Sequence, residues 1–171
     1  MSERPANLGF RRMAADDLPL VRGWLEEPHV GPWWKPSEID DVARAVHGEE
    51  PVDPWLLVLD GADVGYFQVY DVGYDAEYRE ACASVGVEAG TGGMDYLLGD
   101  PALIGHGIGT AAIGTFVDDV VFGLGPYPAV TAGPDPKNAA SLRVLEKNGF
   151  VFVGDIDTSW GPEHLMRKMR C

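Results

Sequence analysis

The chain has little cysteine and little positive charge. Cys82 and Cys171 are the only cysteines among 171 residues, so they build no disulfide framework, and they match no metal-ligand spacing. Lysine and arginine number 13 against 27 acidic residues, and the net charge of −14 argues against nucleic acid and anionic membranes as partners. No apolar run approaches the length of a membrane-spanning helix, which takes about 20 residues. These shortages argue against a cysteine-based metal site, a nucleic-acid binder and a membrane-spanning protein.

The length and composition predict one soluble domain over residues 1–171 with a core of its own. The polar start MSERPANLGF has no apolar stretch of the kind found in signal peptides. We therefore expect a cytoplasmic protein, as a monomer or a homodimer.

Negative charge is unevenly distributed along the sequence. The net charge is −5 over residues 1–59 (11 acidic, 6 basic), −8 over 60–100 (9 acidic, 1 basic) and −1 over 101–171 (7 acidic, 6 basic). One interpretation is a protein with two substrates, an anionic cofactor in the nearly neutral part and a cationic substrate over the acidic part. The alternative is an acidic surface that only keeps the protein soluble.

The central stretch is residues 103–122, LIGHGIGTAAIGTFVDDVVF. Its first half holds three glycines, Gly105, Gly107 and Gly109, and its second half has the period of a helix. The apolar residues that share the predicted buried face are Ile108, Ala112, Phe116 and Val120, with Ile113, Val117 and Val121 beside them.

A glycine-rich turn that runs into a helix is suited to bind an anion. The first amides of the helix lack partners, the glycines allow close approach, and the helix dipole favours negative charge. His106 is either a further donor or a solvent-facing residue. The candidate residues of this site are Leu103, Ile104, Gly105, His106, Gly107, Ile108, Gly109 and Thr110. The alternative is a glycine turn that merely precedes a core helix.

The spacing excludes two common phosphate motifs. A Walker loop needs a lysine before Ser or Thr, and this turn has none. The dinucleotide fingerprint spaces its glycines differently and needs an acidic residue about 20 positions on, whereas Asp118 and Asp119 fall inside the predicted helix.

The rest of the pattern predicts a mixed α/β fold with mostly antiparallel strands and one parallel pair around the central helix. Strands are expected over residues 8–14, 54–60, 64–70, 93–99, 129–132, 150–156 and 165–169. Other helices are expected over 16–27, 38–47 (capped by Ser37) and 138–148 (ended by Gly149). A turn at 60–63 makes a hairpin. Residues 71–93 give no clear pattern beyond a short strand over 83–87, and a loop is expected over 157–164.

The order of these elements, with Asn138 and the stretch RVLEKNGF (143–150), resembles the GNAT N-acetyltransferase superfamily. The resemblance covers the whole chain and implies a central sheet flanked by helices and splayed at an acetyl-CoA site. It implies that the acetyl-CoA pyrophosphate lies on the amides of about 106–110 and that Asn138 belongs to the same site. The polar residue that usually leads the family's glycine turn is absent, because Ile104 stands there.

Within the superfamily the chain is most similar to the aminoglycoside 6′-N-acetyltransferases. The supporting residues are Trp24-Leu25, Pro28-His29-Val30, Trp33-Trp34, Gly65-Tyr66-x-Gln68-x-Tyr70 and Gly93-Met94-Asp95. The resemblance implies that Asp95 contacts the reacting amine as general base. The expected acceptor-binding residues are Trp33, Trp34, Tyr70, Asp95 and Asp135. The alternative for the Trp pair is that it fills the core and does not line a ligand pocket. The alternative for Asp95 is a structural role in a turn or at a sheet edge.

Three positions depart from that branch. Leu145 replaces the tyrosine that protonates the leaving thiolate, and Gly133 and Trp160 replace two substrate-binding aspartates. Nearby acids that could substitute for them are Asp135, Asp155 and Asp157. Water, Ser141 or Tyr96 is then left as the thiolate's proton donor.

The implied reaction is direct attack of a neutral amine on a thioester, which requires no nucleophilic side chain. A carboxylate holds the ammonium group and takes its proton, and a backbone N–H near 96–98 holds the thioester oxygen. Two alternatives stay open. One is acylation of a hydroxylysine-type siderophore precursor, and the other is a non-catalytic acyl-CoA-binding module.

Overall fold

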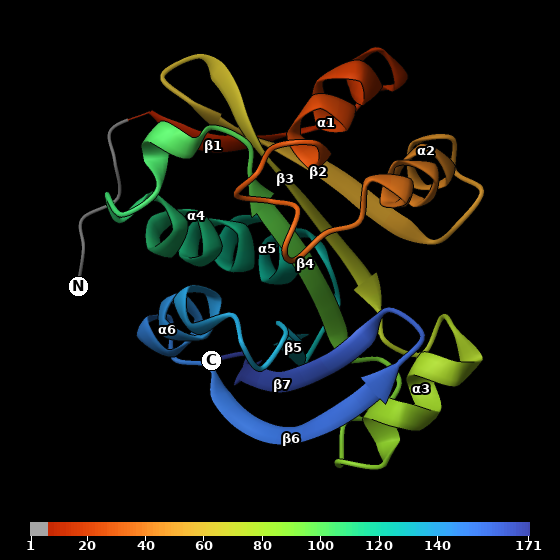
Figure 1. The fold of residues 1–171 in the computed structure, drawn as a ribbon. Helices are drawn as coiled ribbons and strands as arrows, with labels where there is room; N and C mark the ends of the chain where they lie inside the picture. Colours follow the sequence, from red (N-terminus) through yellow and green to blue (C-terminus); the bar gives the residue numbers. More distant parts are fainter. Residues whose placement is uncertain (1–6) are drawn as a thin grey trace. The chain divides into compact units, whose positions relative to one another are not determined.

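The computed structural model describes residues 7–171, which form a seven-stranded sheet with flanking helices (Figure 1). The strand order is β1-β2-β3-β4-β5-β7-β6. The strands are β1 (Leu8–Arg12), β2 (Val52–Leu59), β3 (Ala62–Asp71), β4 (Gly92–Leu98), β5 (Ala129–Ala132), β6 (Val151–Thr158) and β7 (Gly161–Met169). The β4–β5 pair is parallel, whereas β1–β2, β5–β7 and β7–β6 are antiparallel, which confirms the predicted mixed sheet.

Six α-helices accompany these strands in the described part of the chain. They are α1 (Leu18–Leu25), α2 (Ile39–Val46), α3 (Ala76–Ala83), α4 (Ile108–Phe116), α5 (Phe122–Leu124) and α6 (Ala139–Lys147). Three short 3₁₀ turns are η1 (Ala15–Asp17), η2 (Pro36–Glu38) and η3 (Pro101–Leu103).

The chain divides into two compact units. The first comprises residues up to Gln68 together with Tyr96–Ala112, and the second comprises Val69–Asp95 and Ile113–Cys171. Strands β3 and β4 therefore each contribute residues to both units, as does the helix that begins at Ile108.

The first unit is built on α1, α2 and the β2–β3 hairpin. Helix α1 buries Val21, Trp24 and Leu25 on one face, as the sequence period predicts. Its neighbours in the core cluster are Met13, Val30, Val42, Leu56, Tyr66 and Leu97. The hairpin turns on Asp60 and Gly61, whose φ angles of 51° and 81° are those of a two-residue turn matched to the strand twist.

Gly99, just after β4, allows the Trp24 indole to pack against the chain. A Cβ added at Gly99 would overlap the indole ring atoms. Trp24 is buried in the core cluster, so its ring has little room to move aside.

The second unit contains the long β6–β7 hairpin, with α3 against β6 (Figure 1). Helix α6 begins at Asn138, whose side chain accepts a hydrogen bond from the Ser141 amide at 3.2 Å. It ends at Gly149, whose φ of 85° is the left-handed conformation typical of a helix stop. Both ends of α6 lie where the sequence predicted them.

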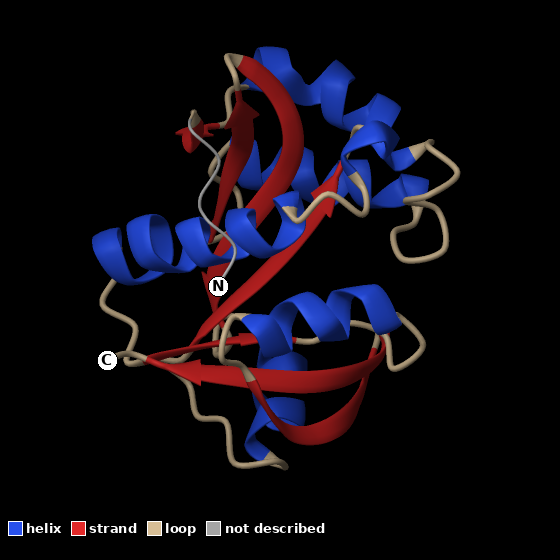
Figure 2. Ribbon diagram, turned by 90° about the vertical axis from the view of Figure 1, so that its left-hand side faces the viewer, coloured by secondary structure: helices blue, strands red, loops and turns tan. Residues whose placement is uncertain are grey.

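The helix that begins with α4 is continuous through a π-helical turn, η4 (Val117–Val121), into α5 (Figure 2). Its buried residues repeat every four positions, as Ala112, Phe116, Val120 and Ile113, Val117, Val121. In an α-helix such rows drift around the axis, because four residues exceed the 3.6 of one turn. A wider turn reduces the drift and keeps both rows buried while Asp118 and Asp119 remain exposed.

Arg170, just beyond β7, holds the end of this helix. Its guanidinium donates to the carbonyls of Phe122, Gly125 and Tyr127 at 2.9, 2.8 and 2.7 Å. The last carbonyls of a helix have no partner within it, so the cation satisfies them and complements the negative end of the dipole.

Three local predictions are wrong. The strand expected over 83–87 is the end of α3 and a turn, because Asp75 caps a helix there. The loop expected over 157–164 is mostly strand, since only Ser159 and Trp160 separate β6 from β7. Ser37 does not cap the second helix: it lies within η2, where the Glu38 carboxylate accepts from the Lys35 amide at 2.6 Å.

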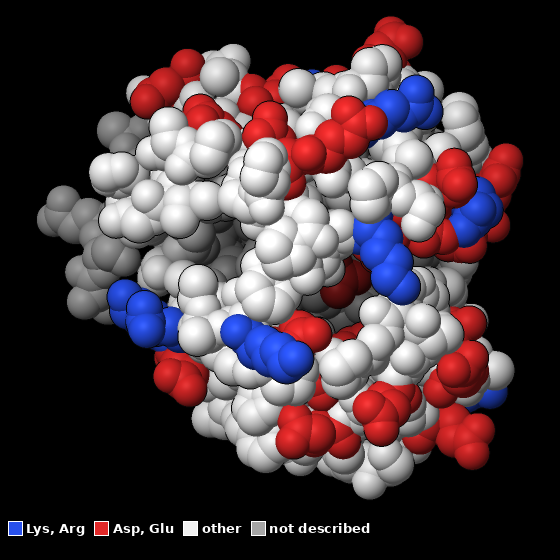
Figure 3. Space-filling model, viewed as in Figure 1, with Lys and Arg blue, Asp and Glu red and all other residues white. Residues whose placement is uncertain are grey.

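Acidic side chains are spread over many parts of the face seen in Figure 3, while basic ones are few. No Asp or Glu among the described residues is fully buried. Most of the negative charge therefore belongs to the solvated surface. In residues 7–171 no helix combines the length and apolar character needed to cross a membrane.

Substituting Gly99 by Ala should destabilise the protein by about 1–3 kcal/mol, because the added methyl group overpacks Trp24. Gly9→Ala on β1 is the matched control, since a Cβ there meets no described atom within 4 Å. Urea denaturation of both variants measures the difference. Equal stability of the two would show that Trp24 is not held as described.

Candidate functional site

The glycine turn lies in the first unit and is open to solvent. Gly105 and Gly107 have φ angles of 83° and 77°, and a Cβ added at either meets no described atom within 4 Å. The Ala111 amide donates to the Gly107 carbonyl at 3.2 Å, and the amides of a first helical turn have no such partner within the helix. The turn is thus an exposed main-chain cradle of the kind that fits an anionic group.

The remaining residues of the predicted anion site differ in exposure. Ile104 and His106 are exposed, so His106 lies on the solvent side of the turn. Leu103, Ile108, Gly109 and Thr110 are half-buried.

The two tryptophans of the first unit have different surroundings. Trp34 packs on the core cluster, lies edge-on to Tyr66 at 6.1 Å, and donates its Nε1 proton to the Tyr96 carbonyl at 3.3 Å. Trp33 is 43% exposed. His29, to which the sequence assigned no role, lies 2.8 Å from the Leu98 carbonyl through Nε2. The loop that carries both indoles is therefore anchored on β4.

In the second unit the parallel pair of strands is short. Strand β4 pairs with β5 only at Gly92 and Gly93, opposite Val130 and Thr131. Asp95 comes two residues later and so shares a face of β4 with Gly93. Residues 94–98 of β4 lie past the end of the parallel pair, which is the splay that the sequence resemblance implied.

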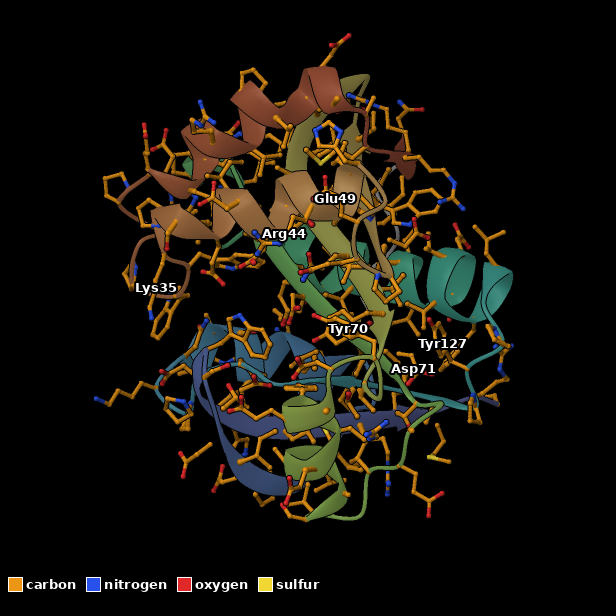
Figure 4. All side chains as sticks on the ribbon, turned by 90° about the vertical axis from the view of Figure 1, so that its right-hand side faces the viewer. Lys35, Arg44, Glu49, Tyr70, Asp71 and Tyr127 are labelled. Carbon is orange, nitrogen blue, oxygen red and sulfur yellow. The ribbon has the colours of Figure 1, made fainter. Side chains whose placement is uncertain are left out.

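Tyr70, at the carboxyl end of β3 (Figure 4), lies over Gly93. A Cβ at Gly93 would come within 2.5 Å of the tyrosine ring. The Tyr70 hydroxyl hydrogen-bonds the Asp95 carboxylate, and the pKa of Tyr70 is well above its usual value, first because of burial and then because of the Asp95 charge. The structure thus brings two predicted site residues together.

A second carboxylate, Glu163 on β7, lies in the same cluster. It accepts from the Tyr78 hydroxyl at 2.8 Å, and its other oxygen lies 3.4 Å from the Thr158 hydroxyl. A Cβ added at Gly133 would overlap the Glu163 carboxylate, so this side chain fills the space that a residue at 133 would occupy. Burial, and then the charge of Asp95, raises the pKa of Glu163 from 4.5 to about 8.

Helix α3 positions Tyr78 through two aspartates. Asp71 (Figure 4) accepts from the amides of Gly73 and Gly90 at 2.7 and 2.9 Å and so joins the two ends of the excursion from β3 to β4. Asp75 begins the helix by accepting from the Tyr78 amide at 2.9 Å. Cys82 follows one turn after Tyr78 and is fully buried, and burial raises the pKa of its thiol to about 12. The thiol is thus packed and unreactive.

Aromatic rings line this cluster. The Tyr70 ring lies edge-on to the rings of Tyr74 and Tyr78, with ring centroids 5.6 and 6.2 Å apart. The Tyr78 ring lies edge-on to that of Trp160, with centroids 6.1 Å apart. Ring faces and carboxylates both favour a cation. The second unit therefore presents an acidic site with aromatic walls.

Two of the three acids that could substitute for the missing aspartates make contacts of their own. Asp135 accepts from the Lys137 amide at 2.8 Å, in the turn before α6. Asp155 pairs with His164 at 2.8 Å. Strand partners Asp155–His164 and Asp157–Pro162 alternate with Ile156–Glu163, so Asp155 and Asp157 point to the opposite face from Glu163. Leu145 is fully buried and has no proton to donate.

Glu163 is the residue that sequence reasoning missed. The predicted loop over 157–164 hid the alternation that places Glu163 on the same face as buried Leu165. Had β7 been extended to Gly161, a carboxylate on an inward strand face would have been recognised as costly, and therefore as a candidate site residue.

Glu163 should make stability depend on pH. Because its pKa is higher in the folded protein (about 8) than the ordinary 4.5, its contribution is fully present below about pH 4.5 and is lost as pH rises toward 8. The expected slope from this group is at most about 1.4 kcal/mol per pH unit within that window. Glu163→Gln should flatten the curve relative to the parent in urea denaturation, and parallel curves would contradict the assignment.

Comparison with known proteins agrees with this architecture. The family model described as acetyltransferase (GNAT) domain matches residues 13–158. The aminoglycoside N(6′)-acetyltransferase type 1 of Klebsiella pneumoniae is 29% identical over 170 residues, which cover 94% of this chain and 82% of that protein. A kanamycin resistance protein of Rhizobium radiobacter is 29% identical over 83 residues, covering 48% of this chain and 76% of that protein.

Solved structures are similar over nearly the full length. The aminoglycoside acetyltransferase AAC(6′)-Ib in complex with coenzyme A superposes with a TM-score of 0.83 at 27% identity, covering 96% of this chain and 95% of that one. The same enzyme with coenzyme A and kanamycin gives 0.83 at 28% identity, with the same coverage. The strand order, the splayed parallel pair and the family match lead to one conclusion: the chain belongs to the GNAT acetyltransferase family.

Proposed function

We propose that the protein transfers the acetyl group of acetyl-CoA to the 6′-amino group of an aminoglycoside. The observation that carries this proposal is the acidic, aromatic-walled site at Asp95, which suits an ammonium-bearing acceptor, in a chain of the acetyltransferase family. Relatives whose sequence and structure match nearly the full length of this chain are aminoglycoside acetyltransferases.

The residues of the glycine turn fit acetyl-CoA. The open space at Gly105 and Gly107 admits a pyrophosphate to the backbone amides of residues 105–110, and the start of α4 favours its charge. Asn138, whose side chain caps α6, would hold another part of the same molecule. When bound, acetyl-CoA supplies the activated acetyl thioester.

Asp95 holds the acceptor amine and takes its proton. Its half-buried carboxylate, hydrogen-bonded by Tyr70, is held in one orientation, and a carboxylate beside an ammonium group can accept a proton directly or through water. Trp33, Trp34 and Tyr70 are proposed to contact the acceptor rings. Asp135 has a smaller part in acceptor binding, because one of its oxygens is already engaged in its own turn.

Acyl transfer also needs a donor for the thioester oxygen and a proton for the leaving thiolate. The segment 96–98 of β4, past the end of the parallel pair, offers backbone N–H groups for the first task. The leaving thiolate cannot take its proton from the family's usual tyrosine, because Leu145 stands at that position, so Ser141, Tyr96 or water is proposed as the donor.

The free cysteines are consistent with a cytoplasmic location, and the expected assembly is a monomer or a homodimer.

Gly107→Ala should weaken acetyl-CoA binding at least tenfold. The added methyl group projects into the open space beside the turn, where the pyrophosphate is proposed to lie, and so would block its approach to the amides. Gly61→Ala is the control for backbone strain, since its φ of 81° is similar and its surroundings are also open. Calorimetric titration of both variants with acetyl-CoA measures the effect. Equal affinities would place the cofactor elsewhere.

Asp95→Asn should reduce aminoglycoside acetylation by about 10²–10⁴-fold while acetyl-CoA affinity stays near that of the parent, because it removes the base and a charge but keeps the shape. Asp157→Asn removes one exposed negative charge from the other face of β6 and should have little effect.

The assay uses aminoglycosides, hydroxylysine derivatives and peptide N-termini as acceptors. A parent that acylates hydroxylysine derivatives alone would replace the proposal by the siderophore-precursor function, and one that binds acetyl-CoA but acylates nothing would indicate a binding module. Full activity of Asp95→Asn would show that Asp95 is structural.

A further inference from the structure

Glu163 is a largely buried carboxylate to which the proposed reaction gives no role. The neutral Tyr78 hydroxyl donates to it at 2.8 Å. The Thr158 hydroxyl lies 3.4 Å from its other oxygen and donates its one proton to the Gly161 carbonyl at 2.8 Å. Among the described residues no lysine, arginine or histidine contributes to its pKa, which is raised by burial and by Asp95. Glu163 thus lies beside the Asp95 carboxylate, and the groups that hydrogen-bond Glu163 itself bring no positive charge.

The backbone directs Glu163 toward the face that carries Asp95. Had the parallel pair continued beyond Gly93 and Thr131, Asp95 and Gly133 would be the next pair on that face. Glu163 fills the side-chain space at Gly133, and Tyr70 fills the side-chain space at Gly93. Side chains from β3 and β7 therefore converge on the end of the parallel pair from its two sides.

A ligand suited to both carboxylates carries two positive charges. A single ammonium group at Asp95 would leave Glu163 buried without a counter-ion, whereas a second ammonium group beside Glu163 would favour its ionised form and pair with it. Tyr78, whose hydroxyl contacts Glu163, lies edge-on to the Trp160 ring, and an aromatic ring face also favours a cation.

We propose that Glu163 is a specificity-determining residue that binds a second ammonium group of the acceptor, distinct from the amine that reacts at Asp95. This role rests on the proposed function and deepens it: the preferred acceptors are polyamines in which a second amine accompanies the reacting one. Glu163 takes over, from β7, the position of a carboxylate that the chain lacks at Gly133.

The test is a cycle that pairs an enzyme variant with altered acceptors. Parent and Glu163→Gln are assayed with kanamycin and with analogues that keep the 6′-amine but lack one other amine each. We expect Glu163→Gln to raise the KM for kanamycin about 10- to 100-fold with little change in kcat, because it removes a charge-assisted contact of binding rather than the base. One analogue, the one that lacks the amine bound by Glu163, should show a similar rise in KM, about 10- to 100-fold, with the parent. Its KM should not rise further with Glu163→Gln.

Moving the carboxylate provides a second variant. Glu163→Ala should behave like Glu163→Gln, and adding Gly133→Asp to Glu163→Ala should recover most of the KM, since the space at 133 is then empty. Gly133→Asp alone should be destabilised by the overlap with Glu163. Asp157→Asn again controls for net charge. Recovery by a carboxylate placed at residue 133, just after β5, would not occur if Glu163 served only to pack.

The KM should also depend on pH. The titratable groups that face Glu163 are Asp95 from β4, Tyr70 from β3, and Tyr78 and Cys82 from α3. An ammonium group binds the ionised carboxylate. The KM of the parent should therefore fall as pH rises from 6 toward 8, by up to tenfold per unit, and that of Glu163→Gln should change less.

The outcomes are distinguishable. A parent that acetylates no aminoglycoside overturns the proposed function and this inference with it. A parent that is active, with Glu163→Gln raising every KM equally or lowering kcat alone, overturns the inference and leaves the proposed function intact.

Discussion

The absence of a side chain at Gly93 and Gly133 is the constraint on which the candidate acceptor site depends. Neighbouring strands lie only about 5 Å apart, so a ring or a carboxylate can cross a strand only where that strand has no Cβ. Tyr70 uses the space over Gly93, and the Glu163 carboxylate uses the space at Gly133. Filling either position would expel the group that defines the site.

The short parallel pair sets the chemistry that the site can perform. After β4 and β5 stop pairing at Gly93, Trp34 and His29 contact the carbonyls of Tyr96 and Leu98, and backbone N–H groups of 96–98 are proposed to serve the substrate. Amine acetylation needs such donors and a nearby carboxylate, and it needs no covalent intermediate. The packed thiol of Cys82 agrees with this, since the one buried cysteine in the unit is unreactive.

Local signals in the sequence were enough to predict those parts of the fold that depend on residues close together in the chain. The hairpin at Asp60-Gly61, the capping of α6 by Asn138 and its end at Gly149 all follow from the short-range preferences of those residues. The Asp95–Tyr70 pairing could be anticipated only through the family resemblance, because 25 residues separate the two in sequence. Helix α3 escaped prediction because its apolar signal is little more than Tyr78 and Cys82. Glu163 escaped because its significance lies in the empty space at a glycine 30 positions away, which no pattern along the chain records.

The guanidinium of Arg170 gives the second unit a mechanical property. Three carbonyls at the end of the long helix and in the loop after it share one cation, which is anchored by the strand β7 that also carries Glu163. Fraying of the helix end therefore requires release of the strand end, and the two segments should open and close as one cooperative unit rather than independently. Strain applied to the strand by a bound ligand would reach the helix through this side chain.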